Sequence, residues 1–512
     1  MPILVVFALT AACLPVRWPA PVFGHGATAA VGFTFAAVCL SVIISFAIRT
    51  WVVRVLRVNP SRRSEVAETY IRLRRIMFFT NVALVGLCVL VFGWGWFVQR
   101  TFVVSDPHDY GLLLAPFAEL LVPMPYFAIL FAAWTVYYDA ERAIHQTSVL
   151  GPISRSFWSR LGYFFHHLRQ FALLVMLPVM LFVTQQTLAR FAPEVTQTDW
   201  YRLASVGVVP VLILFMPLLI KPLLGLKSMP QGAARSRMES LATRLHFRCS
   251  DFLMWPTHGA AANAMIVGLL PQVRYVIFTD RIMEDLPPDE LDAVFGHEVG
   301  HAKHGHIWLY AGFLGLSMTV LAAALLFLDQ QMAAAGIRLP EWSKDWIALP
   351  PVMLVAIYIF LVFGYLSRRC ERQADVYGCR AVSCGNSACK GHDETTIYPE
   401  RASGLCPTGI RTFIRALDRV GLVNSMGDHE PVQQRRSLVM IVKGFLGWLR
   451  AWQHSTMSRR IAFLLSLIHE PDRERRFQRS VTILRWTLIL GLAALLYALG
   501  NTVGWYELLQ VL

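Results

Sequence analysis

Long apolar segments constrain the fold of this sequence more than any other feature. A helix that crosses a bilayer needs about 20 mostly apolar residues. Segments near this length occur at residues 27–48, 77–98, 111–138, 170–189, 203–220, 307–328, 347–366 and 484–504. Only 16% of the 512 residues are charged, which excludes a disordered chain, a collagen-like fibre and an ordinary cytosolic enzyme. We therefore expect a mainly α, multi-span helical membrane protein.

Residues 2–14 form a ninth candidate segment. This stretch is short for a span and has no basic start, so a signal-like or interfacial segment is the alternative to a ninth span. The sequence thus predicts eight or nine spans in a cell membrane of bacterial type.

The distribution of arginine predicts the orientation in the membrane. A run of arginines from Arg49 to Arg75 separates the first two long spans, and loops rich in Lys and Arg stay on the cytoplasmic side. Alternation from there places the two long water-facing segments, 221–306 and 367–483, in the cytoplasm. The net charge of +14 is then explained by cytoplasmic loops. Because no basic stripe is interleaved with aromatic residues, we expect the lipid bilayer as a partner and no nucleic acid.

The segment from Leu286 to His301 carries the clearest chemical signal. Prolines at its start, acids in the next positions and spaced apolar residues predict a helix. It contains His297-Glu298-Val299-Gly300-His301, the HExxH pattern. Residues four apart share one helix face, so both imidazoles can bind one zinc ion while Glu298 acts as the general base.

A catalytic zinc site needs a third protein ligand and one open position. Two acids follow the span at 347–366 on one helical face, four residues apart. Glu371 is the candidate third ligand, and Asp375 is the candidate partner of a zinc-binding imidazole. A solvated face beside the membrane is the alternative explanation for these acids.

This order of motifs resembles the membrane zinc endopeptidases of the HtpX and CAAX prenyl protease type. In that family HExxH is followed by two spans and then by Glu-x-x-x-Asp. Asn263-Ala264 and Gly268 match the family's Asn-Ala-x-x-x-Gly edge strand, which pairs with the substrate backbone. A second strand is expected at 275–279.

A further element, His454 to Ile461, resembles the family's His-Pro-Pro-x-x-x-Arg-Ile sequence. The resemblance implies that His454 and Arg460 stabilise or position the substrate. This chain has Ser455 and Thr456 where the family often has two prolines. The resemblance covers roughly residues 220 to 470, and the N-terminal bundle is a departure from it.

The resemblance implies a cytoplasmic zincin-like catalytic domain with a small β-sheet, and a protein or peptide substrate. We expect hydrolysis of peptide bonds, with membrane or misfolded proteins favoured over prenylated CAAX tails. A non-catalytic zinc-bound scaffold or transporter is the alternative from another class. The sequence does not define an oligomeric state.

The expected organisation has five parts. Residues 1–220 form an N-terminal transmembrane bundle, and residues 221–306 form the first part of the catalytic domain, with the edge strand and the HExxH helix. A transmembrane hairpin follows at 307–366. The third zinc ligand and a cysteine-rich insertion lie in the second catalytic part, 367–483, and 484–512 form a C-terminal transmembrane helix.

Two more histidines follow the HExxH motif. His304 lies near the helical face of His301 and could be a spare ligand. His306 is expected to point roughly opposite, and the family resemblance implies that it is a structural residue at the helix end.

Cysteines concentrate after the third predicted ligand. A second, structural metal site is the hypothesis for some members of this set, which comprises Cys379, Cys384, Cys389, His392 and Cys406. Unpaired thiols in an inserted loop are the alternative, since the Cys-x4-Cys spacing differs from the usual Cys-x2-Cys.

Overall fold

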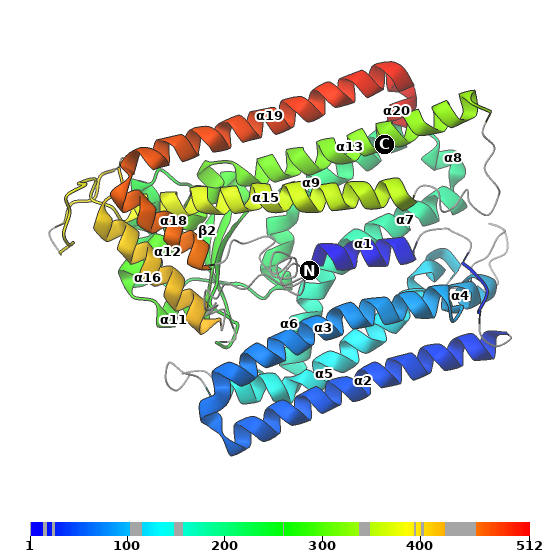
Figure 1. The fold of residues 1–512 in the computed structure, drawn as a ribbon, viewed down its shortest axis with the longest axis horizontal. Helices are drawn as coiled ribbons and strands as arrows, with labels where there is room; N and C mark the ends of the chain where they lie inside the picture. Colours follow the sequence, from blue (N-terminus) through cyan, green and yellow to red (C-terminus); the bar gives the residue numbers. More distant parts are fainter. Residues whose placement is uncertain are drawn as a thin grey trace, which may run out of the picture. The chain divides into compact units, whose positions relative to one another are not determined.

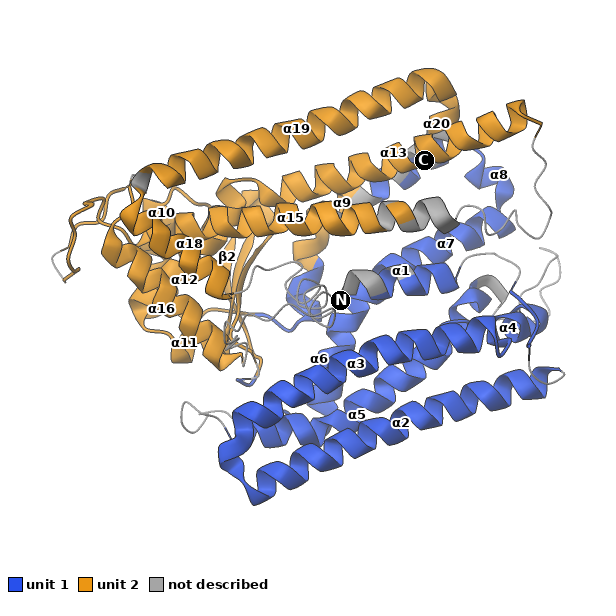
Figure 2. Ribbon diagram, viewed as in Figure 1, with its two compact units in different colours: residues 1–209, 219–226, 258–260 blue, residues 210–218, 227–257, 261–512 orange. Residues whose placement is uncertain are grey.

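The structure is a computed structural model, shown as a ribbon in Figure 1. It describes residues 2–13, 18–22, 26–102, 115–147, 157–259, 261–336, 349–393, 396–400, 404–424 and 457–511. The chain divides into two compact units, coloured separately in Figure 2. Unit 1 comprises residues 1–209, 219–226 and 258–260, and unit 2 comprises residues 210–218, 227–257 and 261–512.

Unit 1 is helical. Its elements are α1 (Pro2–Ala12), α2 (Ala27–Val58), a 3-10 turn (Pro60–Arg62), α3 (Arg63–Leu90), α4 (Trp94–Phe102), a 3-10 segment (Ala115–Leu121), α5 (Met124–Gln146), α6 (Arg160–Phe171), a π-helical segment (Ala172–Met176), α7 (Leu177–Phe191), α8 (Pro193–Thr196) and most of α9 (Asp199–Leu223). A large aromatic core forms between α5 and α6, with Trp134 and Phe171 edge to face at 5.9 Å.

Unit 2 combines long helices with a small sheet. Its helices are α10 (Ala233–Arg244), α11 (Asp280–Asp285), α12 (Pro288–Lys303), α13 (His306–Ala334), α15 (Leu349–Ala381), α16 (Pro407–Val423), α18 (Met457–His469), α19 (Pro471–Val503) and α20 (Trp505–Val511). Its strands are β1 (Lys227–Ser228), β2 (Asp251–Trp255), β3 (Ala264–Val267) and β4 (Tyr275–Thr279), with a 3-10 turn at Pro271–Val273.

The sheet is mixed and has the order β1-β2-β4-β3. The β2–β4 pair is parallel, and β1 and β3 run antiparallel to their neighbours. Among the described residues, β3 pairs only with β4, so it lies at an edge of the sheet. The small β-sheet expected from the sequence is therefore confirmed, with strands at both predicted positions.

Close packing between α12 and α15 holds the centre of unit 2 together. A side chain at Gly296 would place its Cβ 2.4 Å from the Cβ of Ala381, and one at Gly300 would approach the Cβ of Tyr377 to 2.8 Å. Gly378 on α15 has the same role, because its added Cβ would lie 2.9 Å from the carbonyl oxygen of Ala293. The two backbones can approach this closely only because small residues occupy the contact.

Five helical segments in the described part of the chain are long and apolar enough to cross a membrane. They are Ala27–Val58, Pro60–Leu90, Arg160–Phe191, His306–Ala334 and Asp472–Val503. The stretch 2–14 corresponds to the short helix α1. The mainly helical fold is confirmed, while the count of eight or nine spans, their orientation and the five-part organisation stay predictions.

Candidate metal centre

Helix α12 brings the two histidines of the HExxH motif to one point. It starts with Pro288 at its first position and Asp289 and Glu290 in its first turn, where acids complement the helix dipole. The Nε2 atoms of His297 and His301 lie 3.2 Å apart. The predicted helix and the shared face of the two imidazoles are both present.

Glu371 on α15 completes a group of three possible ligands. One carboxylate oxygen lies 3.9 Å from Nε2 of His297, and the other lies 3.7 Å from Nε2 of His301. The ligand atoms of the three residues all lie within 4.8 Å of one another. Two imidazole nitrogens and one carboxylate are a donor set of catalytic zinc sites, which keep a fourth position open. The residues present therefore fit a zinc ion.

Asp375 lies behind the first histidine. Its Oδ1 is 3.0 Å from Nδ1 of His297, and its side chain is fully buried. Arg460 on α18 donates a hydrogen bond of 2.9 Å from Nε to the same carboxylate and has a second guanidinium contact with it. Because Asp375 occupies Nδ1 of His297, the Nε2 lone pair of that ring is directed toward the other ligands.

A second arrangement, not anticipated from the sequence, orients His301. Its Nδ1 lies 2.9 Å from Nδ1 of His306, whose Nε2 lies 3.0 Å from Oε1 of Gln373. The amide NH2 of Gln373 donates to Gln478, which directs Oε1 toward His306. His306 Nε2–H then donates to Gln373, so His306 Nδ1 accepts from His301 and leaves Nε2 of His301 available for a metal.

The expected orientation of His306 was wrong, and the reason is a helix break. Gly305 adopts a left-handed conformation with φ of 65°, which ends α12 and starts α13 at His306. The helical wheel of α12 therefore cannot be extended to His306. His304 stacks on His306 with ring centroids 5.7 Å apart and is not part of the three-ligand group.

The candidate base, Glu298, lies between the ligands and the edge strand. Its carboxylate is 4.0 Å from Nε2 of His297 and accepts a hydrogen bond from the backbone N–H of Ile266 on β3. Burial raises the pKa of Glu298 to about 7, and the negative charge of Glu371 acts in the same direction. A carboxyl with a pKa near neutrality suits both acceptance and return of a proton.

The two histidines differ in their electrostatic environment. Burial lowers the pKa of His301 to about 4, which keeps its imidazole neutral as a metal ligand must be. Burial acts to lower the pKa of His297 as well. The hydrogen bond with Asp375 and its negative charge outweigh the effect of burial, so the pKa of His297 is raised.

The other residues singled out in the sequence have different positions. Asn263 precedes β3 with an exposed side chain, and its backbone N–H donates to the Thr279 hydroxyl on the neighbouring strand. Ala264 is buried in the sheet. His454 lies outside the described residues. Arg460 is buried, and its guanidinium also lies 3.6 Å from Glu371.

Comparison with known proteins places this centre in a family. The model of peptidase family M48 matches residues 228–393, which contain β3, the HExxH helix and Glu371. The segment that holds the candidate metal centre is thus similar to peptidase family M48. This match and the long apolar helices support an integral membrane protein with a metallopeptidase domain, as the resemblance of its motifs implied.

Relatives with two different names are similar to this chain. A Protease HtpX homolog from Archaeoglobus fulgidus is 30% identical over 30% of this chain and 45% of its own length. The CAAX prenyl protease 1 homolog from Arabidopsis thaliana is 31% identical over 19% of this chain and 23% of its own length. The chain thus matches less than two thirds of the length of either relative.

Solved structures are also similar to this chain. The crystal structure of S. mikatae Ste24p aligns with 84% of this chain and 98% of its own length, with a TM-score of 0.49 and 14% identity.

Proposed function

We propose that this protein is a zinc-dependent endopeptidase that hydrolyses peptide bonds in membrane or misfolded proteins. The observation that carries the proposal is the convergence of His297, His301 and Glu371 within 4.8 Å, with the carboxylate of Glu298 beside them. A site of purely structural zinc is normally closed by a fourth protein ligand and has no use for a neighbouring basic carboxylate.

The chemistry divides between the metal and the residues around it. His297, His301 and Glu371 would hold a zinc ion, which would act as a Lewis acid toward the scissile carbonyl and the attacking water. Glu298 accepts a proton from the attacking water and then transfers it to the leaving amine. Burial favours the protonated form of Glu298, which helps its carboxyl hold the proton between the two transfers.

The edge strand β3 provides a place for the substrate backbone. The backbone N–H of Ile266 points toward Glu298, on the side of β3 away from β4. An extended peptide that adds to this edge brings its backbone alongside the proposed base. Asn263 and Ala264, at the start of the strand, are the proposed contacts for substrate binding.

Asp375 and Arg460 act through the ligands in this proposal. Asp375 orients His297, and Arg460 neutralises the buried carboxylate of Asp375 and lies near Glu371. Since the guanidinium of Arg460 is committed to these acids, we assign it a positioning role. We propose His454 as the residue that stabilises the charge developing on the carbonyl oxygen.

The test is cleavage of fluorescently labelled casein by the detergent-purified protein. We expect Glu298→Gln to lower turnover by at least about 10²-fold, since general base catalysis contributes about 10²–10⁴. Glu239→Gln, a partly exposed acid on α10, is the matched control and should cleave like the wild type. Equal turnover of Glu298→Gln and wild type would show that the assigned base is wrong.

A second substrate class has direct support from the relatives, because the Arabidopsis thaliana protein is named a CAAX prenyl protease 1 homolog. The two classes are separated by offering a farnesylated CAAX peptide and its unprenylated form. We expect casein cleavage and no preference for the prenyl group. Cleavage restricted to the prenylated peptide would establish the second class.

A further inference from the structure

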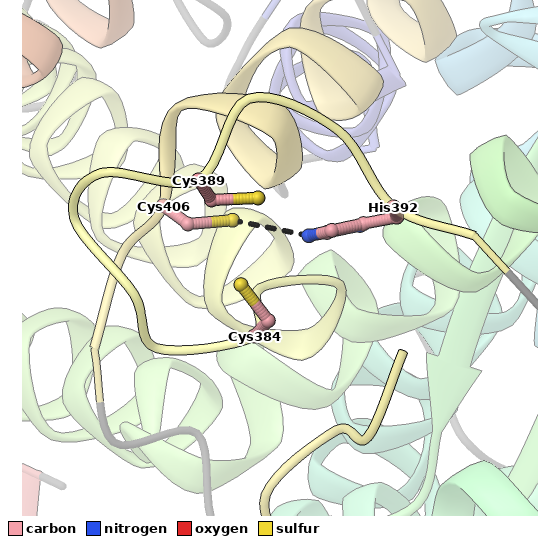
Figure 3. A group of neighbouring side chains, drawn as sticks. All are labelled: Cys384, Cys389, His392 and Cys406. Carbon is pink, nitrogen blue, oxygen red and sulfur yellow. Dashed lines mark hydrogen bonds between the residues drawn. The ribbon is translucent and has the colours of Figure 1, made fainter. Parts of the chain in front are cut away.

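A second group of metal-binding side chains lies in unit 2, separate from the centre described above. It consists of Cys384, Cys389, His392 and Cys406, here called the cysteine–histidine cluster. One ligand atom from each residue lies within 4.8 Å of the others, and Figure 3 shows the side chains directed toward one another. Three soft sulfur ligands and one imidazole match the Cys3His set of structural zinc sites.

We infer that the cysteine–histidine cluster binds a structural zinc ion that joins the end of α15 to the start of α16. Four protein ligands leave no open position, so the site has the closed form of structural zinc rather than a catalytic form. Contacts outside the cluster orient Cys389, His392 and Cys406.

A contact at each ring nitrogen orients the imidazole of His392. Its Nε2 lies 3.3 Å from Sγ of Cys406, as the dashed line in Figure 3 marks, and its Nδ1 lies 3.3 Å from the hydroxyl of Tyr398. The contact with Tyr398 leaves Nε2 of His392 directed into the cluster. Such a partner on the second ring nitrogen is typical of zinc-binding histidines.

Cys406 occupies the N-cap position of α16. Its Sγ accepts a hydrogen bond of 3.2 Å from the backbone N–H of Gly409, while its own N–H donates to Ser383. The N-terminal end of α16 and this N–H therefore face the sulfur of Cys406. Gly409 allows the approach, since an added Cβ there would lie 2.9 Å from the carbonyl oxygen of Cys379.

The loop between the helices brings the other two cysteines to the same point. Gly385, with φ of 79°, turns the chain directly after Cys384. The backbone N–H of Cys389 then donates to the carbonyl of Asn386, forming a tight turn. Cys379, a member of the set considered from the sequence, is not part of the cluster. It lies on α15 in the apolar core with Phe413 and is fully buried.

The position of the cluster suggests what the ion stabilises. Helix α16 begins at Pro407, directly after Cys406, and carries Phe413, whose ring stacks on His297 with centroids 5.8 Å apart. Helix α15 ends at Ala381, just before the cluster, and carries Glu371 and Asp375. A zinc ion in the cluster therefore fixes the two helices that support the catalytic centre while making no contact with the substrate.

The test counts zinc in the full chain by native mass spectrometry. We expect two equivalents in the wild type and one in the double variant Cys384→Ser/Cys389→Ser. The variant His297→Ala/His301→Ala should also retain one, and this one is assigned to the cluster whether or not the protein cleaves peptides. Cys249→Ser, a cysteine of the same unit outside the cluster, is the matched control and should keep two.

A measurement on the wild type keeps the test independent of variant folding. After the metal is removed under reducing conditions, binding of cobalt(II) should produce the thiolate-to-cobalt charge-transfer absorption of a Cys3His site. One zinc in the wild type that disappears in His297→Ala/His301→Ala would overturn the inference. So would a disulfide between two cluster cysteines in protein purified under reducing conditions, or cobalt binding without thiolate absorption.

Discussion

The glycine contact between α12 and α15 gives the sharpest prediction about how this fold supports catalysis. Gly296 directly precedes the first zinc ligand, His297, and faces Ala381 on α15. The variant Gly296→Ala adds a single methyl group that is remote from the substrate. It tests whether the close approach of the two helices sets the geometry of the ligands they carry.

The expected effect follows from one distance. The new Cβ would lie 2.4 Å from the Cβ of Ala381, whereas carbon atoms in contact prefer about 3.5–4.0 Å. The helices must separate by roughly 1 Å, and overpacking of this kind costs about 1–3 kcal/mol. Replacing glycine with alanine inside a helix stabilises the helix by about 1 kcal/mol. The net loss in the free energy of unfolding is therefore about 0–2 kcal/mol. A misplacement of about 1 Å lowers turnover roughly 10²-fold.

The assay is casein cleavage beside thermal unfolding of the same preparations. Gly421→Ala on α16 is the control, because nothing lies within 4 Å of its added Cβ, and it should keep wild-type activity. The double variant Gly296→Ala/Ala381→Gly removes the clashing partner and should recover most of the activity. Wild-type turnover in Gly296→Ala, or no recovery in the double variant, would refute the packing argument.

Three further predictions concern the groups around the ligands. Asp375→Asn should lower zinc affinity about 10–100-fold by altering the partner of an imidazole, as measured by competition with a chelator, and unchanged affinity would contradict its role. His306→Ala should weaken zinc binding in the same assay, with His304→Ala as a control that does not. In metal-free protein the pKa of Glu298 is raised from about 4.5 in the unfolded chain to about 7 in the fold. Below pH 4.5 the protonated carboxyl therefore contributes about 3 kcal/mol to the free energy of unfolding, and this contribution is lost as the pH rises through about 7. The difference in unfolding free energy between Glu298→Gln and wild type should therefore grow over this range, and a difference independent of pH would exclude the assigned pKa.

Much of the site could be predicted because its residues follow simple helical spacing. Two histidines four apart on one helix, and two acids four apart on another, need no tertiary information to be placed on common faces. The resemblance to the family then predicted that these two helices contribute to one site, and it predicted the edge strand. The structure confirms the position of that strand, β3, at an edge of the sheet.

The parts that sequence reasoning missed depend on breaks and on packing between elements. His306 contacts His301 because Gly305 turns the chain. The only sign of that turn in the sequence is Gly305-His306, directly before the apolar segment 307–328. Cys379 shares the sequence neighbourhood of the cluster but points into the core, since helix α15 continues to Ala381. The role of glycines at the α12–α15 contact is visible only once both helices are placed.

The zinc content of two glutamate variants tests the central claim most directly. The account assigns Glu298 as the base and Glu371 as a ligand, so Glu298→Gln should keep the zinc content of the wild type and Glu371→Gln should lose one equivalent per chain. Equal zinc content in the two variants, or loss from Glu298→Gln alone, would contradict the assignment of ligands on which the proposed peptidase mechanism depends.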